Sequence, residues 1–177
     1  MTGESDSIVV RSARADDADS IGRIHVVSWQ SAYLDALPED FLQGLSIADR
    51  QQAWRQRLTA VSGPVRTLVV TDGGAVAGFA CVSASRDEDA PEGTGELLSI
   101  YLDPASWSQG LGRRLHAEAV ETLRRDGYQR ATLWVVDSNA RARRFYEHAG
   151  WTADGASKAH PLAGGPPLTV VRYVLPL

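Results

Sequence analysis

Several features that would restrict the function of this 177-residue chain are missing, and each absence excludes a class of protein. There is one cysteine, Cys81, so no disulfide can form within the chain and a reducing compartment is expected. No run of apolar residues approaches the roughly 18 that a membrane span needs. The polar, acidic stretch from Met1 to Ser7 lacks the basic and apolar regions of a signal peptide. We therefore expect a cytoplasmic protein that does not bind a membrane.

An excess of positive charge is missing as well. The 18 Lys and Arg residues stand against 22 Asp and Glu residues, giving a net charge of −4. Because affinity for nucleic acid depends on a basic surface, no nucleic-acid partner is expected. Lysine itself is nearly absent, since Lys158 is the only one and the other 17 basic residues are arginines. No group of Cys, His and carboxylate residues has metal-ligand spacing, so we expect no metal.

What is present is the composition of one globular domain. The hydrophobic fraction is 44% and the charged fraction 23%, both close to the average for soluble domains. We expect a single domain over residues 1–177, with residues 1–7 as a flexible N-terminal segment. Cys81 lies in the apolar stretch from Gly78 to Val82, which indicates a buried strand residue rather than a nucleophile.

Hydrophobic periodicity and turn residues predict a mixed α/β domain. The pair Asp72-Gly73 followed by Gly74 indicates a hairpin turn, and a strand–helix–strand unit in the middle of the chain implies a locally parallel pair. We predict a loop at Arg86–Gly95 and another after Trp151. Strands are expected at 8–11, 67–71, 75–83, 96–102, 131–136 and 168–175, and helices at about 16–33, 40–58, 110–126 and 139–149.

The clearest chemical feature is the short loop Trp107–Gly112, which follows a strand and opens a helix. Gly110 and Gly112 lack a Cβ and let a ligand approach the backbone. The exposed N–H groups at a helix N-terminus then suit an anion such as phosphate. A tight turn with packing glycines is the alternative. The Walker pattern is excluded by the absence of Gly-Lys-Ser/Thr, and the Rossmann fingerprint by Leu115 at its third small position.

Two segments together resemble the GNAT superfamily of acyl-CoA-dependent N-acyltransferases. Trp107–Gly112 is similar to the family loop Arg/Gln-x-x-Gly-x-Gly/Ala, and Asn139–Trp151 is similar to the family segment Asn-x-x-Ala-x-x-Phe-Tyr-x-x-x-Gly-Phe. Both are in the right order, and the resemblance extends from Ile8 to Leu175. Trp107 departs from the pattern, because the family prefers Arg or Gln there, and it removes one polar side chain near the expected diphosphate.

The resemblance implies an α/β fold: a mostly antiparallel sheet of six to seven strands with a central splayed parallel pair, flanked by about four helices. It implies that acetyl-CoA is the cosubstrate and lies in the gap between the splayed strands. Backbone groups of Ile100 and Leu102 would pair with the pantetheine amides, and N–H groups from Ser108 to Arg113 would hold the diphosphate. The cofactor-binding residues implied are Ile100, Tyr101, Leu102, Trp107, Ser108, Gln109, Gly110, Leu111, Gly112, Arg113, Asn139 and Tyr146.

Two residues are catalytic candidates by the same resemblance. Acetyl transfer needs a neutral amine, so a base must take a proton from an ammonium whose ordinary pKa is about 10.4. Glu96 is the candidate base, with a strand-end carboxylate paired to an arginine as the alternative. Tyr146 is the candidate general acid for the leaving thiolate, with a core tyrosine as the alternative.

The residues that would bind the acceptor amine are indicated less specifically than those for acetyl-CoA. By the resemblance, the first helices cover the substrate mouth, which gives Trp29 and Tyr33 as candidates, and Trp134 lies on the strand facing the acyl end. Aromatic side chains there could bind an ammonium by cation–π contact, or they could pack between helices or in the core. His116 and His148 are interpreted as ordinary surface or boundary residues.

The function implied is direct transfer of an acetyl group from acetyl-CoA to a primary amine of a small molecule or peptide. A non-catalytic acyl-CoA sensor on the same fold, and a nucleotide-binding domain of another class, are the alternatives. Many members of the superfamily form dimers, so a homodimer involving the last strand is a further expectation from the resemblance.

Overall fold

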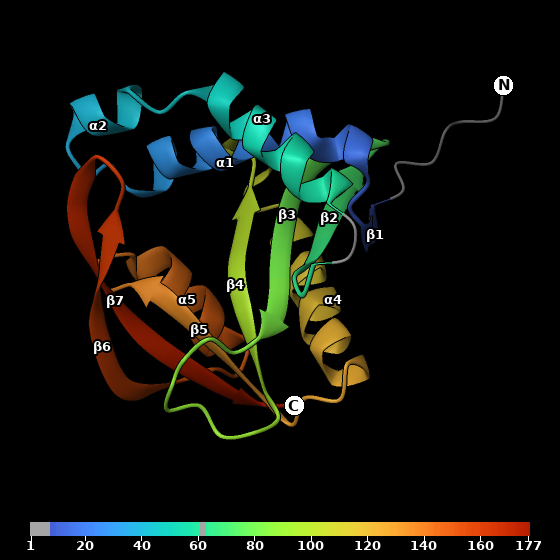
Figure 1. Ribbon diagram of the computed structural model, residues 1–177, viewed down its shortest axis with the longest axis vertical. Coiled ribbons are helices and arrows are strands. Elements are labelled where there is room, and N and C mark those ends of the chain that lie inside the picture. The colour runs from blue at the N-terminus through green and yellow to red at the C-terminus, as the bar shows by residue number, and fades with distance from the viewer. Residues whose placement is uncertain (1–7, 61–62) are drawn as a thin grey trace, which may run out of the picture.

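The computed structural model describes residues 8–60 and 63–177, and the N-terminal segment 1–7 that the sequence predicts as flexible lies outside them. These residues form a seven-stranded sheet in the order β1-β2-β3-β4-β5-β7-β6 (Figure 1). The strands are β1 (Val9–Ser12), β2 (Arg66–Asp72), β3 (Ala75–Ala84), β4 (Thr94–Leu102), β5 (Arg130–Val136), β6 (Thr152–Leu162) and β7 (Gly165–Pro176). The mixed α/β class and the strand count are as predicted.

Strands β1 to β4 form an antiparallel half-sheet. The β2–β3 hairpin turns at Gly73 and Gly74, whose φ angles of 53° and 84° lie in the region that glycine enters without strain. The predicted hairpin is thus confirmed.

The single parallel contact in the described sheet joins β4 to β5 and is short. It covers three residue pairs, from Thr94 with Arg130 to Glu96 with Thr132. Beyond Glu96 the two strands diverge, while β5 continues to pair with β7 as far as Val136. The splayed parallel pair implied by the resemblance is therefore present, and it leaves one edge of β4 without a strand neighbour.

The part of the chain that follows α5 differs from the prediction. The segment after Trp151, predicted as a loop, forms β6 and pairs antiparallel with β7. This segment is mostly exposed, so it lacks the apolar alternation that marks a strand in the sequence. Its pairing depends instead on β7 and on the positive-φ turn at Gly164.

Helices cover both faces of the sheet (Figure 1). Helices α1 (Ala18–Ala32) and α3 (Ile47–Thr59) lie on one face, and α4 (Leu111–Arg125) packs against β2, β3 and β4 on the other. The short α2 (Glu39–Gln43) follows α1, and α5 (Ala140–His148) follows β5. Two 3-10 turns, η1 (Ala15–Asp17) and η2 (Pro104–Ser106), complete the helical segments.

The predicted helix over 40–58 is wrong in its continuity, because the chain breaks at Gly44 into α2 and α3. Ser46 begins the second helix, since its hydroxyl accepts a hydrogen bond from the backbone N–H of Asp49 at 3.1 Å. A serine that caps the start of α3 takes up a non-helical backbone conformation, which prevents α2 and α3 from forming one continuous helix. The described chain therefore has five α-helices instead of about four.

Alternation along β2 and β3 separates two of the three hydrophobic clusters of the described residues. Val70, Ala80 and Val82 face α4, whereas Val69, Phe79 and Cys81 face α1 and α3. Cys81 is 1% exposed, which confirms its interpretation as a buried strand residue, and burial raises the pKa of its thiol. In the described part of the chain, none of the helices has both the length and the apolar character to cross a membrane.

Candidate active site

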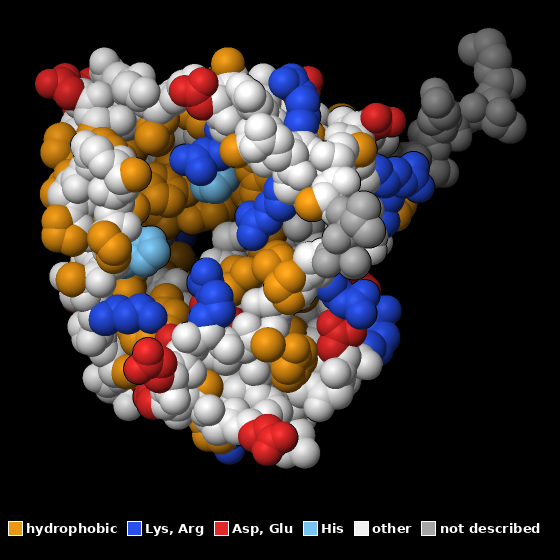
Figure 2. Space-filling model, viewed as in Figure 1, with side chains coloured by type: hydrophobic (Ala, Val, Ile, Leu, Met, Phe, Trp, Pro, Cys, Tyr) orange, Lys and Arg blue, Asp and Glu red, His pale blue; other side chains and the backbone are white. Residues whose placement is uncertain are grey.

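A cavity of about 970 Å³ lies where β4 and β5 diverge. Its wall is built by β4 from Leu97 to Leu102, by the loop before α4, by the first turns of α5 and by the end of α1. Figure 2 shows the surface hollowed between α1 and β4 on one side and β6 and β7 on the other, with hydrophobic side chains in the hollow and Lys and Arg side chains at its rim. The splay of the sheet thus produces a concave site.

The backbone of β4 is available along this wall. The N–H of Asp103 donates to the carbonyl of Ala77 on β3 at 2.8 Å. Since alternate residues of a strand direct their backbone groups to opposite neighbours, Ile100 and Leu102 present theirs to the gap. Both residues line the cavity, as does Tyr101. The structure therefore places the predicted pantetheine-binding strand beside an open edge.

A β-bulge, which sequence reasoning missed, interrupts β4 in the same place. Leu97 and Ser99 pair with the consecutive residues Val82 and Cys81 of β3, so Leu98 is an extra residue. Bulges occur next to active sites because they redirect the backbone locally. Leu97, Leu98 and Ser99 all line the cavity. No residue type in this stretch signals the bulge.

The predicted anion loop forms the N-terminus of α4. Gly110 has φ 80° and Ser108 has φ 65°, so the chain turns sharply before the helix begins at Leu111. A Cβ on Gly112 would lie 3.3 Å from Cδ1 of Leu102, so glycine keeps this end of the cavity open. Ser108, Gly110, Gly112 and Arg113 line the cavity, whereas Leu111 is buried in the core and Gln109 donates to the carbonyl of Ala105.

Trp107, the departure from the family pattern, has two specific contacts. Its indole N–H donates to the carbonyl oxygen of Leu102 at 3.3 Å, and the guanidinium of Arg141 lies 3.8 Å above its ring. Arg141 and Trp107 both line the cavity. Arg141 therefore brings a positive charge to the cavity beside Trp107, where its guanidinium stacks on the indole.

Asn139 and Tyr146 lie at the two ends of α5. The side-chain oxygen of Asn139 caps the helix by accepting from the N–H of Ala142 at 3.0 Å, and both residues line the cavity. Tyr146 is 8% exposed, and its burial raises the pKa of the phenol. The hydroxyl therefore remains protonated at neutral pH and can donate a hydrogen bond into the cavity.

The structure does not bring Glu96 to the cavity wall. Glu96 is 3% exposed, and its carboxylate accepts from the backbone N–H of Arg86 at 3.0 Å and from the guanidinium of Arg86 at 3.1 Å. It occupies the last paired position of β4 before the strands diverge. The neighbouring Leu97 lines the cavity, but Glu96 does not.

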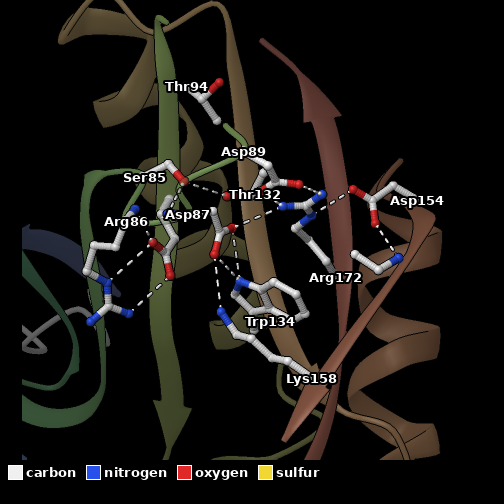
Figure 3. A network of polar contacts seen from close by, with 12 residues as sticks. Ser85, Arg86, Asp87, Asp89, Thr94, Thr132, Trp134, Asp154, Lys158 and Arg172 are labelled. Carbon is white, nitrogen blue, oxygen red and sulfur yellow. Dashed lines mark hydrogen bonds and ion pairs between the residues drawn. The ribbon is translucent and has the colours of Figure 1, made fainter. Parts of the chain in front are cut away.

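Trp134 lines the cavity from β5 and belongs to a polar network (Figure 3). Its indole N–H donates to both carboxylate oxygens of Asp87 at 3.0 Å. The ammonium of Lys158 lies 3.8 Å from the centre of the Trp134 ring and 3.2 Å from Asp87. One cation–π position of this ring is thus already occupied from within the chain.

Arg172 extends this network across the sheet (Figure 3). Its guanidinium pairs with Asp89 at 2.6 Å and with Asp154 at 2.7 Å, and it approaches Asp87 at 3.5 Å. The loop between β3 and β4, predicted as irregular, is therefore tied to β6 and β7. This contact holds the cavity wall on the side of β5.

Of the two aromatic residues predicted at the end of α1, Tyr33 lines the cavity and Trp29 does not. Trp29 packs edge-on against Tyr33 with ring centroids 5.0 Å apart, and its buried indole N–H has no hydrogen-bond partner within the described residues. Burial raises the pKa of Tyr33, which keeps its hydroxyl protonated. Tyr33 is thus a wall residue, and Trp29 supports it from behind.

His116 and Asp35 also line the cavity and are not among the sequence candidates. His116, interpreted as a surface or boundary residue, is 6% exposed and lines the cavity from α4. Asp35 lies in the turn after α1 and is the acidic residue among the lining residues of the described chain. His116 could have been found from its spacing, since it follows Gly112 by one helical turn and shares its face. Among residues 8–60 and 63–177, no group of three or more His, Cys, Asp and Glu residues could hold a metal ion.

Comparison with known proteins agrees with this geometry. The model of the acetyltransferase (GNAT) family matches residues 26–151, which include most of the cavity wall. The uncharacterized N-acetyltransferase YuaI of Bacillus subtilis is 33% identical over 133 residues, covering 75% of this chain and 73% of that protein.

Solved structures are similar over nearly the whole chain. A GCN5-related N-acetyltransferase from Rhodopseudomonas palustris aligns with a TM-score of 0.76 at 20% identity, covering 100% of both chains. The protein yncA from Salmonella typhimurium, solved with its cofactor acetyl-CoA, aligns with a TM-score of 0.68 at 24% identity, covering 97% of this chain and 94% of that one. At these identities the two structures establish the fold.

Proposed function

The chain belongs to the acetyltransferase (GNAT) family, and from this premise we propose that it transfers the acetyl group of acetyl-CoA directly to a primary amine. The observation that carries the proposal is the cavity itself. It combines an unpaired strand edge along β4 with a helix N-terminus at one end. A long ligand with amide groups and a terminal diphosphate matches both features.

The residues present fit acetyl-CoA. At the start of α4, the backbone N–H groups of Leu111, Gly112 and Arg113 precede the first intrahelical bond, which Arg114 donates to Gly110. These groups would hold the diphosphate, with the guanidiniums of Arg113 and Arg141 nearby. The backbone of Ile100 and Leu102 would pair with the pantetheine amides. Acetyl-CoA supplies the thioester, and the chain orients it.

The function is tested by incubating the protein with acetyl-CoA and a panel of amines while thiol release is measured. We expect amine-dependent release of CoA, and stabilisation against heat by CoA but not by ATP or NAD. Binding of acetyl-CoA without turnover on any amine would instead support a sensor on the same fold. Stabilisation by ATP or NAD alone would contradict the proposal.

Tyr146 is proposed as the group that protonates the leaving thiolate. Replacement Tyr146→Phe removes the hydroxyl and keeps the ring that packs against Phe145 and Trp151. Since a positioned general acid typically contributes at least about 100-fold, kcat should fall by roughly this factor, while the Kd for CoA should not change. Tyr128→Phe, outside the cavity, is the matched control. Unchanged kcat in Tyr146→Phe would show that the tyrosine is only a packing residue.

Glu96 is proposed as the base, with water as the carrier of the proton. Water is required because the carboxylate lies behind the wall, paired with Arg86. Its position at the divergence of β4 and β5 brings it next to the bulge residues Leu97 and Leu98. A carboxylate in this position can accept, through the water, the proton that the ammonium gives up.

Replacement Glu96→Gln should lower kcat about 100-fold, because the amide cannot take up the proton. Arg86→Gln is the control, because it breaks the same ion pair but retains the carboxylate. It should keep most of the turnover. If both variants lose the same thermal stability and the same share of turnover, Glu96 serves only as the partner of Arg86.

The acceptor is proposed to carry a positive group besides the reacting nitrogen. The cavity has Arg113 and Arg141 at the end formed by α4 and α5, and Asp35 on the wall contributed by the turn after α1. The anionic cofactor is favoured at the arginines, which leaves Asp35 for the acceptor. A second ammonium suits this carboxylate, since the reacting nitrogen must give up its proton.

Replacement Asp35→Asn should raise the KM for a diamine roughly threefold to fivefold, as expected for an exposed ion pair. The KM for a monoamine of equal chain length should not change, and the diamine effect should weaken at high salt because exposed charges are screened. Asp40→Asn, on α2 and outside the cavity, is the control. An equal rise for both amines would refute a role for Asp35 in recognising the second charge.

A further inference from the structure

His116 has one ring nitrogen committed to a buried partner. The indole N–H of Trp151 donates to Nε2 of His116 at 2.8 Å, and both residues are buried. An indole N–H is a donor only, so Nε2 must act as the acceptor and cannot carry a proton. This contact settles which nitrogen is free to bear hydrogen.

The other nitrogen then carries the proton. Burial lowers the pKa of His116 to about 4, so the ring is neutral at neutral pH and has one N–H, at Nδ1. No partner for Nδ1 is found within residues 8–60 and 63–177, and Nδ1 is not among the fully buried atoms that lack one. Because His116 is almost completely buried apart from the cavity it lines, this donor faces the cavity.

The orientation of the ring is held by aromatic neighbours. Phe145 meets it edge-on at 5.5 Å between ring centroids, and Trp151 does so at 6.1 Å. Turning the ring over about the Cβ–Cγ bond would place Cε1, which cannot accept a hydrogen bond, towards Trp151 and leave the buried indole donor without an acceptor. Nδ1–H is therefore a preorganised donor.

The position of His116 along α4 indicates what this donor meets. It follows Gly112 by four residues, which corresponds to about 6 Å along the helix. The N-terminus of the helix is the proposed diphosphate site, so His116 lies beside the next part of the ligand. On the other side of the gap runs the open edge of β4, including Ile100.

We propose that His116 is a cofactor-binding residue whose Nδ1–H donates a hydrogen bond to an amide carbonyl or hydroxyl oxygen of the pantetheine arm of acetyl-CoA. This inference rests on the proposed function. Because the Nδ1–H donor is uncharged, it suits a neutral oxygen of the pantetheine arm, whereas the charged Arg113 and Arg141 suit the phosphates. Trp151, which lies outside the wall, acts as the positioning residue for His116.

Two replacements separate the role of the two nitrogens. In His116→Gln the terminal amide can still accept from Trp151 near the position of Nε2, but the donor at Nδ1 is lost. In His116→Asn a donor near Nδ1 is retained, but Trp151 loses its acceptor. His160→Gln, an exposed residue on β6 away from the cavity, is the control.

Binding is measured by calorimetry with CoA and with adenosine 3′,5′-diphosphate, which lacks the pantetheine arm, and stability by thermal unfolding. His116→Gln should weaken CoA about threefold to tenfold and leave the nucleotide unaffected, with a Tm near that of the unmodified protein. His116→Asn should lower the Tm but bind CoA more tightly than His116→Gln does. The control should match the unmodified protein in every measurement.

Two results would overturn the inference. If His116→Gln binds CoA as tightly as the unmodified protein, His116 serves only Trp151. If it weakens CoA and adenosine 3′,5′-diphosphate equally, the effect is an indirect one on the diphosphate site. Failure of the proposed function is distinguishable from both, because the unmodified protein would then show no saturable binding of CoA.

Discussion

The separation of β4 from β5 after three residue pairs is the constraint on which the rest of the structure depends. A strand edge with unpaired N–H and C=O groups is costly when buried, so the edge must meet water or an extended ligand. The flanking elements keep the gap open. Glycines at the start of α4 leave room for a ligand, and the bulge at Leu98 interrupts the regular pairing of β4 with β3 beside the gap.

The two sides of the gap are stabilised by different means. At the end where β4 and β5 are still paired, Arg172 of β7 binds Asp87 of the β3–β4 loop and Asp154 of β6, so the loop is tied to these two strands. At the opposite end, next to the loop before α4, Trp107 stacks against the guanidinium of Arg141 on α5. The second contact places the positive charge of Arg141 at the end of the cavity beside Trp107, the position where the family prefers a polar residue.

The elements that carry chemistry could be predicted from the sequence because they are local. The turn at Gly73, the helix opening at Gly110 and the cap at Asn139 each depend on residues a few positions apart. What could not be predicted depends on contacts between distant residues. Strand β6 is exposed and has no apolar alternation, so it forms only through its pairing with β7. The break at Gly44 is different, because the cap that Ser46 gives to Asp49 is local and was available in the sequence.

The candidate site shows the same division. The wall residues Tyr33, Trp134 and Tyr146 were identified by type and by resemblance, and they do line the cavity. Glu96, by contrast, lies behind the wall because it pairs with Arg86, ten positions earlier and across a loop. The orientation of His116 depends on Trp151, 35 residues away. No local pattern encodes either contact.

Strand β7 has a consequence for how the protein is made. Past Thr132, β5 has no strand neighbour except β7, which ends at Pro176. One wall of the cavity therefore cannot form on the ribosome until β7 has emerged, although every residue proposed to contact acetyl-CoA precedes β7 in the chain. The nascent chain carries the binding residues before it can form the site, and the twelve residues of β7 complete that site.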